Sequence, residues 1–147
     1  MNDRYLFRAK RTDNGEWMEG YYLFCPIQAD NKPSLENFTY KHWIVTHNGN
    51  PFEIDQSTIC QYTGLTDKNG NKIWENDIVE AWSQGRCAIG KIKHRIDGTW
   101  IMYPAWQNGE MWYLLPNDDG ITTVEVIGNI FDNKELLESE DKNESNY

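Results

Sequence analysis

The sequence lacks several features that define large classes of protein. No run approaches the roughly 18 consecutive apolar residues that a membrane-spanning helix needs. The first residues, with Asp3, Arg4 and Arg8, lack the apolar core of a secretory signal. Basic residues are also few, since 14 Lys and Arg against 23 Asp and Glu give a net charge of −9. We therefore expect a cytoplasmic protein that does not bind DNA through a broad cationic surface.

Metal-ligating residues are scarce as well. The three cysteines, Cys25, Cys60 and Cys87, are odd in number and fit neither a disulfide framework nor a Cys-x-x-Cys motif, so we expect reduced, buried thiols. His42 and His47 are five residues apart, which places them on opposite sides of a strand. The sequence predicts no metal site and no cofactor.

Catalytic motifs are missing too. There is no G-x-S-x-G nucleophile elbow, no cysteine with a histidine close in sequence, and no glycine-rich run that opens a helix. The carboxylate pairs Glu53/Asp55 and Glu75/Asp77 share one side of a strand, but turns and solvated faces explain them. We expect no catalytic residues and a protein that is not an enzyme.

What the sequence does contain favours β-structure. Seven tryptophans and eight tyrosines supply the rings that prefer strands. Residues 4–11 alternate with a period of two, residues 12–15 suit a turn, and residues 16–24 complete a predicted hairpin. Pro26 and Pro33 predict a loop over residues 25–37, and a further strand is expected at 42–47.

The second half of the chain predicts a small barrel. Five short strands are expected at 77–83, 86–95, 99–103, 110–115 and 121–127, each separated by turn-forming residues. Five such strands in about 50 residues suggest an SH3-like barrel. Asp132 and Glu135 form a capping box that starts a short helix. The expected organisation is a β-rich N-terminal subdomain (1–72), an SH3-like barrel (73–131), a C-terminal helix (132–138) and a disordered acidic tail (139–147).

The segment 61–79 is the most informative, and it reads QYTGLTDKNGNKIWENDIV. This sequence resembles the signature of the YopX family, small proteins of temperate phages and prophages. Residues 7–10 with 14–17 resemble the opening hairpin of that family, and residues 126–131 with 135–137 resemble its closing motif. Two positions differ from the usual sequence of the family: Trp74 stands where Tyr is commoner, and Asn76 stands where Gly is commoner.

The resemblance implies a mainly β fold that ends in an SH3-like unit, a phage origin and self-association. It implies no established biochemical activity. The residues that carry it form a structural signature: Gln61, Tyr62, Thr63, Gly64, Leu65, Asp67, Gly70, Ile73, Glu75, Asp77, Ile78 and Val79.

Physical reasoning gives the signature an architectural role. Asn76 can replace Gly at a left-handed position, and Asp67 can accept backbone N–H bonds in an Asx-turn over Asn69 and Gly70. Gly64 and Gly70 permit turns, and Ile73, Ile78 and Val79 suit a core. The alternative is that Asp67, Glu75 and Asp77 form a ligand or catalytic surface.

A cationic stripe is the other notable pattern. Lys91, Lys93 and Arg95 share one face of a predicted strand, and Ala88, Ile92 and Ile96 share the other, with Gly90 as a candidate bulge. Trp100 or Trp106 beside this stripe would let it bind single-stranded nucleic acid. An ordinary solvated strand face is the competing interpretation.

Three functional hypotheses result. The leading one is a non-enzymatic phage accessory protein that acts through protein contacts, as a homo-oligomer and with a host or phage protein as a further partner. The second is nucleic-acid binding through the cationic stripe. The third is an acidic protein that mimics nucleic acid.

Overall fold

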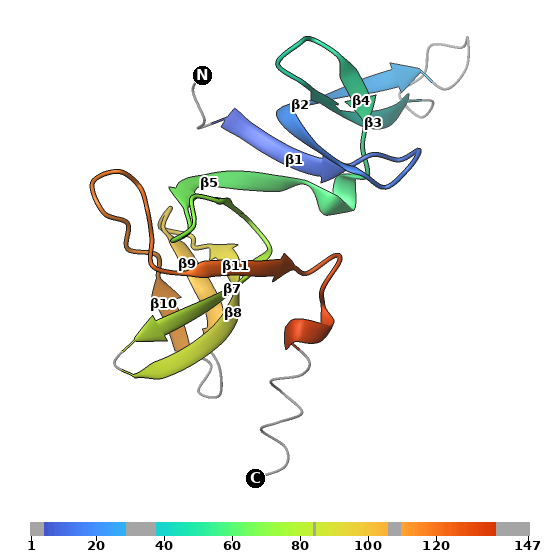
Figure 1. Ribbon diagram of the computed structural model, residues 1–147. Helices are drawn as coiled ribbons and strands as arrows, with labels where there is room; N and C mark the ends of the chain where they lie inside the picture. Colours follow the sequence, from blue (N-terminus) through green and yellow to red (C-terminus); the bar gives the residue numbers. More distant parts are fainter. Residues whose placement is uncertain (1–4, 29–37, 84, 106–109, 138–147) are drawn as a thin grey trace. The chain divides into compact units, whose positions relative to one another are not determined.

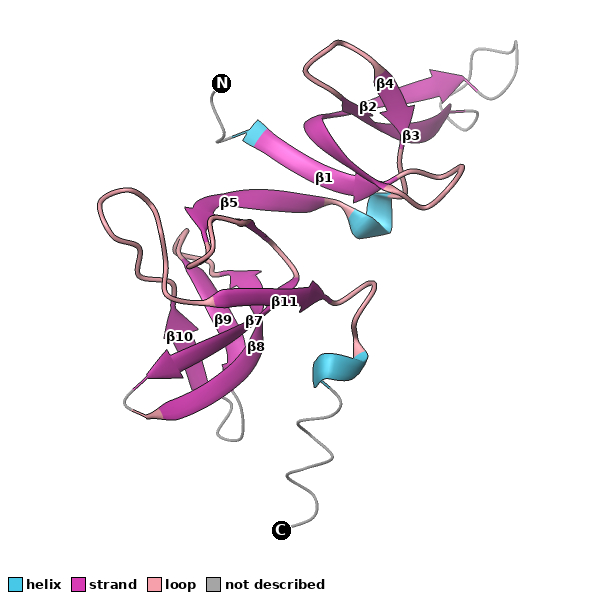
Figure 2. Ribbon diagram, viewed as in Figure 1, coloured by secondary structure: helices cyan, strands magenta, loops and turns pink. Residues whose placement is uncertain are grey.

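A computed structural model describes residues 5–28, 38–83, 85–105 and 110–137. The described chain is mainly β, as predicted, and its strands are antiparallel (Figures 1 and 2). It divides into two compact units, Met1–Gln61 and Tyr62–Tyr147. Trp106 and the predicted tail at 139–147 lie outside the described residues.

The first unit is built on a β-hairpin that a third and a fourth strand extend. Its strands are β1 (Leu6–Lys10), β2 (Trp17–Gln28), β3 (Phe38–Val45) and β4 (Pro51–Glu53), in the spatial order β4-β3-β2-β1. A short 3₁₀ turn, η3 (Gln56–Thr58), precedes β5 (Cys60–Thr66), whose first residues pair with β1. Ala9, Ile44 and Ile54 form the core, because the period-two pattern of β1 and β3 points them to one side.

One expectation for this unit is wrong. Residues 25–28 belong to β2 rather than to a loop, and Pro26 pairs with Tyr40 of β3. Among the described strands β2 has a partner on only one side here, because β1 pairs with it no further than Tyr21. An edge of this kind tolerates a residue that has no N–H.

The second unit holds a five-stranded sheet and a small hairpin. The sheet runs in the order β10-β9-β8-β7-β11, and the remainder of β5 pairs with β6. Five strands in this order are compatible with the predicted SH3-like barrel. The bounds of its elements are β6 (Lys72–Trp74), β7 (Asp77–Ser83), β8 (Arg86–His94), β9 (Trp100–Ala105), β10 (Glu110–Tyr113) and β11 (Glu125–Asn129).

The core of the second unit lies on one face of this sheet. It includes Ile73, Val79, Ile92 and Met102, each at most 1% exposed, and Leu65 of the signature packs against it. The signature therefore contributes to this core. The boundary between the two units follows Gln61, whereas the predicted boundary follows residue 72.

Two details of the C-terminal part differ from the sequence analysis. The last strand is β11, which starts at Glu125, because Thr122 bonds to Thr66 of β5 instead of to the sheet (Thr122 N to Thr66 O, 2.8 Å). Of the predicted helix at 132–138, the described residues include one helical turn at residues 135–137. Asp132 precedes that turn, and the Asn133 side chain accepts the Asn129 N–H at 3.2 Å.

Candidate functional site

The turn between β5 and β6 is organised by the side chain of Asp67. This carboxylate is fully buried, and its Oδ1 accepts the N–H groups of Asn69 (2.9 Å) and Asn71 (2.8 Å). Gly70 has φ +85°, a left-handed conformation that glycine adopts without strain. The predicted Asx-turn and the predicted left-handed glycine are both confirmed.

The second oxygen of Asp67 reaches beyond its own turn. Its Oδ2 accepts the Val126 N–H of β11 at 3.1 Å and the Asn71 side-chain amide at 3.2 Å. Burial alone would raise the pKa of the Asp67 carboxyl, but the hydrogen bonds from Val126, Asn71 and Asn69 outweigh it, so the pKa lies below its ordinary value. The carboxylate is thus an ionised tie between the turn and β11.

A second buried carboxylate, Asp77, closes the turn between β6 and β7. It is 2% exposed and accepts the Trp74 N–H at 2.8 Å. Asn76, just before it, is the one non-glycine residue with positive φ (+69°) in the described chain, which confirms its predicted left-handed conformation. Its backbone bonds to Ile92 and Ile130 hold this turn against the sheet (Asn76 N to Ile92 O, 2.9 Å; Ile130 N to Asn76 O, 3.0 Å).

The other signature residues support the same hairpin. Thr63 donates its hydroxyl to the Ile73 carbonyl at 2.8 Å, and Tyr62 packs on Trp74 with ring centroids 5.3 Å apart. Ile73, Ile78 and Val79 are fully buried, as predicted for core residues. Gly64 has φ +83°. Gln61 and Glu75 are half-buried.

The buried carboxylates of the signature are not accessible for binding or catalysis. Asp67 and Asp77 are inaccessible to solvent and both accept backbone N–H bonds, as an architectural role requires. Among the described residues, no group of three or more His, Cys, Asp or Glu is placed to hold a metal ion. His42, one of the two histidines considered above, lies 2.5 Å from the hydroxyl of Tyr22 through its Nδ1.

The cationic stripe lies on the face of the sheet opposite the core. Lys93 is exposed, and Lys91 and Arg95 are half-buried. The Lys93 ammonium lies 5.6 Å from the ring centroid of Tyr103, and the Arg95 guanidinium lies 5.7 Å from that of Tyr113 and donates to the Tyr113 hydroxyl. We call Lys91, Lys93, Arg95, Tyr103 and Tyr113 the cationic face.

The aromatic partners of the stripe differ from those expected. Trp100 packs against the core and stacks on His94 with centroids 4.3 Å apart. Tyr103 and Tyr113 lie beside the cations in place of Trp100, and neither tyrosine was predicted from the sequence. Strand register reveals them, because Tyr103 pairs with Lys91, and Tyr113 lies across Ile101 from Lys93.

Two other expectations for this strand are wrong. Ala88 and Ile92 are buried as expected, but Ile96 is fully exposed because β8 ends at His94 and Ile96 lies in the following turn. Gly90 is not a bulge, since the register between β7 and β8 continues through its pairing with Val79.

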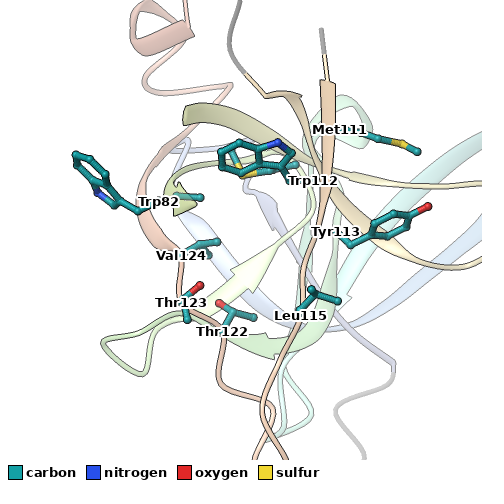
Figure 3. Close-up of a pocket in the computed structure, with 10 residues that line it drawn as sticks. Trp82, Met111, Trp112, Tyr113, Leu115, Thr122, Thr123 and Val124 are labelled. Carbon is teal, nitrogen blue, oxygen red and sulfur yellow. The ribbon is translucent and has the colours of Figure 1, made fainter. Parts of the chain in front are cut away.

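A hollow of about 360 Å³ lies in the second unit, and Figure 3 shows the side chains that line it. Its rim includes two exposed side chains, Trp82 at 62% and Leu115 at 78%. Its lining residues come from β7, β9, β10 and the segment after it: Ala81, Trp82, Met102, Met111, Trp112, Tyr113, Leu115, Thr122, Thr123 and Val124.

Comparison with known proteins identifies a family. In the part of the chain that the structure describes, no helix is both long and apolar enough to cross a membrane. No curated protein matches the sequence. The family model described as YopX protein matches residues 6–138, which span both units and the whole signature. The chain therefore belongs to the YopX family.

Proposed function

We propose that this protein is a non-enzymatic accessory protein of a temperate phage or prophage, and that it acts in the host cytoplasm through protein contacts. Its principal contact is with a second copy of itself. The observation that carries the proposal is a pair of exposed aromatic side chains on one face of the β2–β3 hairpin, Phe24 and Tyr40, which we call the aromatic ribbon.

The aromatic ribbon lies where the first unit has the fewest strands. β1 pairs with β2 only as far as Tyr21, and β4 pairs with β3 only from Trp43 onward. Phe24 and Tyr40 are 53% and 62% exposed. A two-stranded hairpin is marginally stable in water, and clustered exposed apolar side chains mark interaction surfaces. Contact with another chain would bury this surface.

Charge favours a second copy as the occupant. The chain carries a net charge of −9, so two copies repel each other in general. The stretches 20–28 and 38–46 contain no acidic residue, and their one lysine, Lys41, lies 3.8 Å from Glu53 of β4. Two copies can therefore meet at the ribbon without bringing acidic groups together.

The contact is expected to be face to face rather than strand to strand. Pro26 and Lys41 occupy this hairpin, and both residue types discourage an additional strand at a sheet edge. The rings themselves offer the packing surface, since Phe24 stacks on His42 at 5.6 Å and lies 5.7 Å from Tyr40. A two-fold dimer would place the same patch of each copy in contact.

Light scattering during size-exclusion chromatography tests this proposal. The wild type should elute with a multiple of its 17.3 kDa chain mass. The double variant Phe24→Ser/Tyr40→Ser should elute as a monomer. Ile96→Ser removes an apolar side chain that is even more exposed, from a turn of the second unit, and should keep the wild-type mass.

Circular dichroism of each variant establishes that it is folded. A monomeric wild type, or a folded double variant that assembles as the wild type does, would contradict self-association through the ribbon.

The hollow supports a further contact, with a phage or host protein that inserts an apolar side chain. Trp82 and Leu115 at its rim are too exposed to serve the core of the second unit. Once a partner has been isolated with the wild-type chain, Leu115→Ser should weaken its binding and leave the mass of the oligomer unchanged. Undiminished binding by this variant would place the partner elsewhere.

A further inference from the structure

The cationic face combines positive charge with exposed aromatic rings on three neighbouring strands. Lys91 and Lys93 are on β8, Tyr103 is on β9 and Tyr113 is on β10, and Arg95 directly follows β8. From this geometry we infer that the cationic face binds single-stranded nucleic acid. The inference concerns the second unit and is independent of the self-association proposed for the first.

The three cations follow one line. Lys91, Lys93 and Arg95 alternate along the chain, and alternate residues of a strand are roughly 6.6 to 6.8 Å apart on one face. That separation resembles the one between successive phosphates of an extended nucleic-acid strand. Arg95 forms an ion pair with Asp97 at 3.7 Å, so a phosphate would compete with this carboxylate for the guanidinium. The stripe is thus a local region of positive charge that can face phosphates, although the chain as a whole is acidic.

The two tyrosines provide platforms for bases. Tyr103 and Tyr113 are 39% and 47% exposed, whereas Ile101 between them is 5% exposed and forms the floor. Tyr113 faces Ile101, two residues before Tyr103, so the two tyrosines are diagonal neighbours about 7 to 8 Å apart. Stacking of bases on such rings tolerates any sequence, because every base has a π-face.

A recess joins the charges to the rings. It measures about 300 Å³ and is lined by Lys93, His94, Arg95, Ile96, Ile101, Tyr103 and Met111. Figure 3 shows Met111 and Tyr113 leaving β10 on one side and Trp112 on the other. Met111 of β10 therefore provides a wall of this recess for an unstacked base.

A single strand fits this face better than a duplex or an acidic peptide. Duplex DNA hides its base faces and is held chiefly through phosphate neutralisation, which a chain of net charge −9 supports poorly. An acidic peptide would use the cations and leave the two rings without stacking partners. Single-stranded nucleic acid uses both.

Fluorescence anisotropy of the full-length chain with a labelled oligothymidine tests the inference. The affinity should fall steeply with rising salt, with a slope of about 0.7 per phosphate neutralised. Lys93→Gln should lower that slope by one such step. Tyr103→Ala should weaken binding about tenfold or more, and Tyr103→Phe, which keeps the ring, should bind nearly as the wild type does.

Lys68→Gln is the matched control. Lys68 is also an exposed lysine of the second unit, but it pairs with Glu125 at 3.5 Å and does not line the recess. It should leave both affinity and salt slope unchanged. Melting temperatures show whether each variant is folded, and Tyr103→Phe and Lys93→Gln keep the inference testable if Tyr103→Ala unfolds.

Several results would overturn the inference. These are absence of oligothymidine binding at low salt, an equal loss of affinity in Lys68→Gln, and tighter binding of the corresponding duplex. Binding of oligoglutamate in place of oligothymidine would identify the face as a surface for acidic peptides. Ribbon variants that are monomeric yet still bind the oligonucleotide would separate this result from failure of the proposed self-association.

Discussion

Replacing Asp67 by asparagine should destabilise the second unit strongly, although the two side chains have nearly the same shape. The carboxylate of Asp67 accepts four hydrogen bonds, three from backbone N–H groups and one from the Asn71 side chain. An asparagine keeps one acceptor oxygen and replaces the other with an NH₂ group. That NH₂ group would then face donors.

The structure sets the size of this effect. If the remaining oxygen keeps the bonds from Asn69 and Asn71, the Val126 N–H loses its acceptor at 3.1 Å. A buried donor without a partner costs about 1 to 3 kcal/mol, and the two remaining bonds are weaker because their acceptor is no longer charged. We expect a loss of about 2 to 4 kcal/mol in the free energy of unfolding.

Urea unfolding followed by tryptophan fluorescence measures this loss. Asp119→Asn is the control, because Asp119 lies in an exposed turn and its substitution removes the same charge. It should change the free energy of unfolding by less than about 0.5 kcal/mol. If Asp67→Asn behaved like Asp119→Asn, the claim that the buried carboxylate ties the turn to β11 would be refuted.

Three further outcomes are expected. Folding lowers the pKa of Asp13, Asp67 and Asp97. The stability that these carboxylates contribute should therefore be fully present above the unfolded-state pKa of about 3.9 and should be lost as the pH falls through their lower folded-state pKa values. Acid titration followed by circular dichroism should show a shallower loss in Asp67→Asn than in the wild type. Gly70→Val should cost about 1 kcal/mol or more in urea unfolding; no atom lies within 4 Å of the added Cβ, so an unchanged stability would show that φ +85° carries no strain. Asp77→Asn should lower the melting temperature because the carboxylate accepts the buried Trp74 N–H, and it should do so more than Glu75→Gln, because Glu75 is only half-buried; an unchanged melting temperature in Asp77→Asn would contradict the architectural role.

The features that could be predicted from the sequence are those fixed by neighbouring residues. The left-handed conformations of Gly70 and Asn76 and the Asx-turn of Asp67 depend on a few adjacent positions. The first hairpin is equally local, since β1 and β2 pair across a short turn. The apolar side chains of Ile78 and Val79 were sufficient to predict their burial, although the two residues are consecutive and point to opposite faces of β7, both of which are buried at that point.

The features that escaped prediction depend on register and on distant partners. The bond from Val126 to Asp67 joins residues 59 positions apart, and no local pattern marks it. Tyr103 and Tyr113 join the cationic face because of how β8, β9 and β10 align, whereas Trp100 turns to the core. Pro26 suggested a loop because the sequence does not show that β2 is an edge at that position.

Hydrogen–deuterium exchange at increasing protein concentration tests the central claim, that copies meet at the aromatic ribbon. Residues 20–28 and 38–45 should become protected as the concentration rises, because their backbone amides lie beneath the proposed contact. The amides of β7 to β9 should exchange at a constant rate. Protection confined to the second unit, or exchange that does not depend on concentration anywhere in an oligomeric sample, would contradict the account.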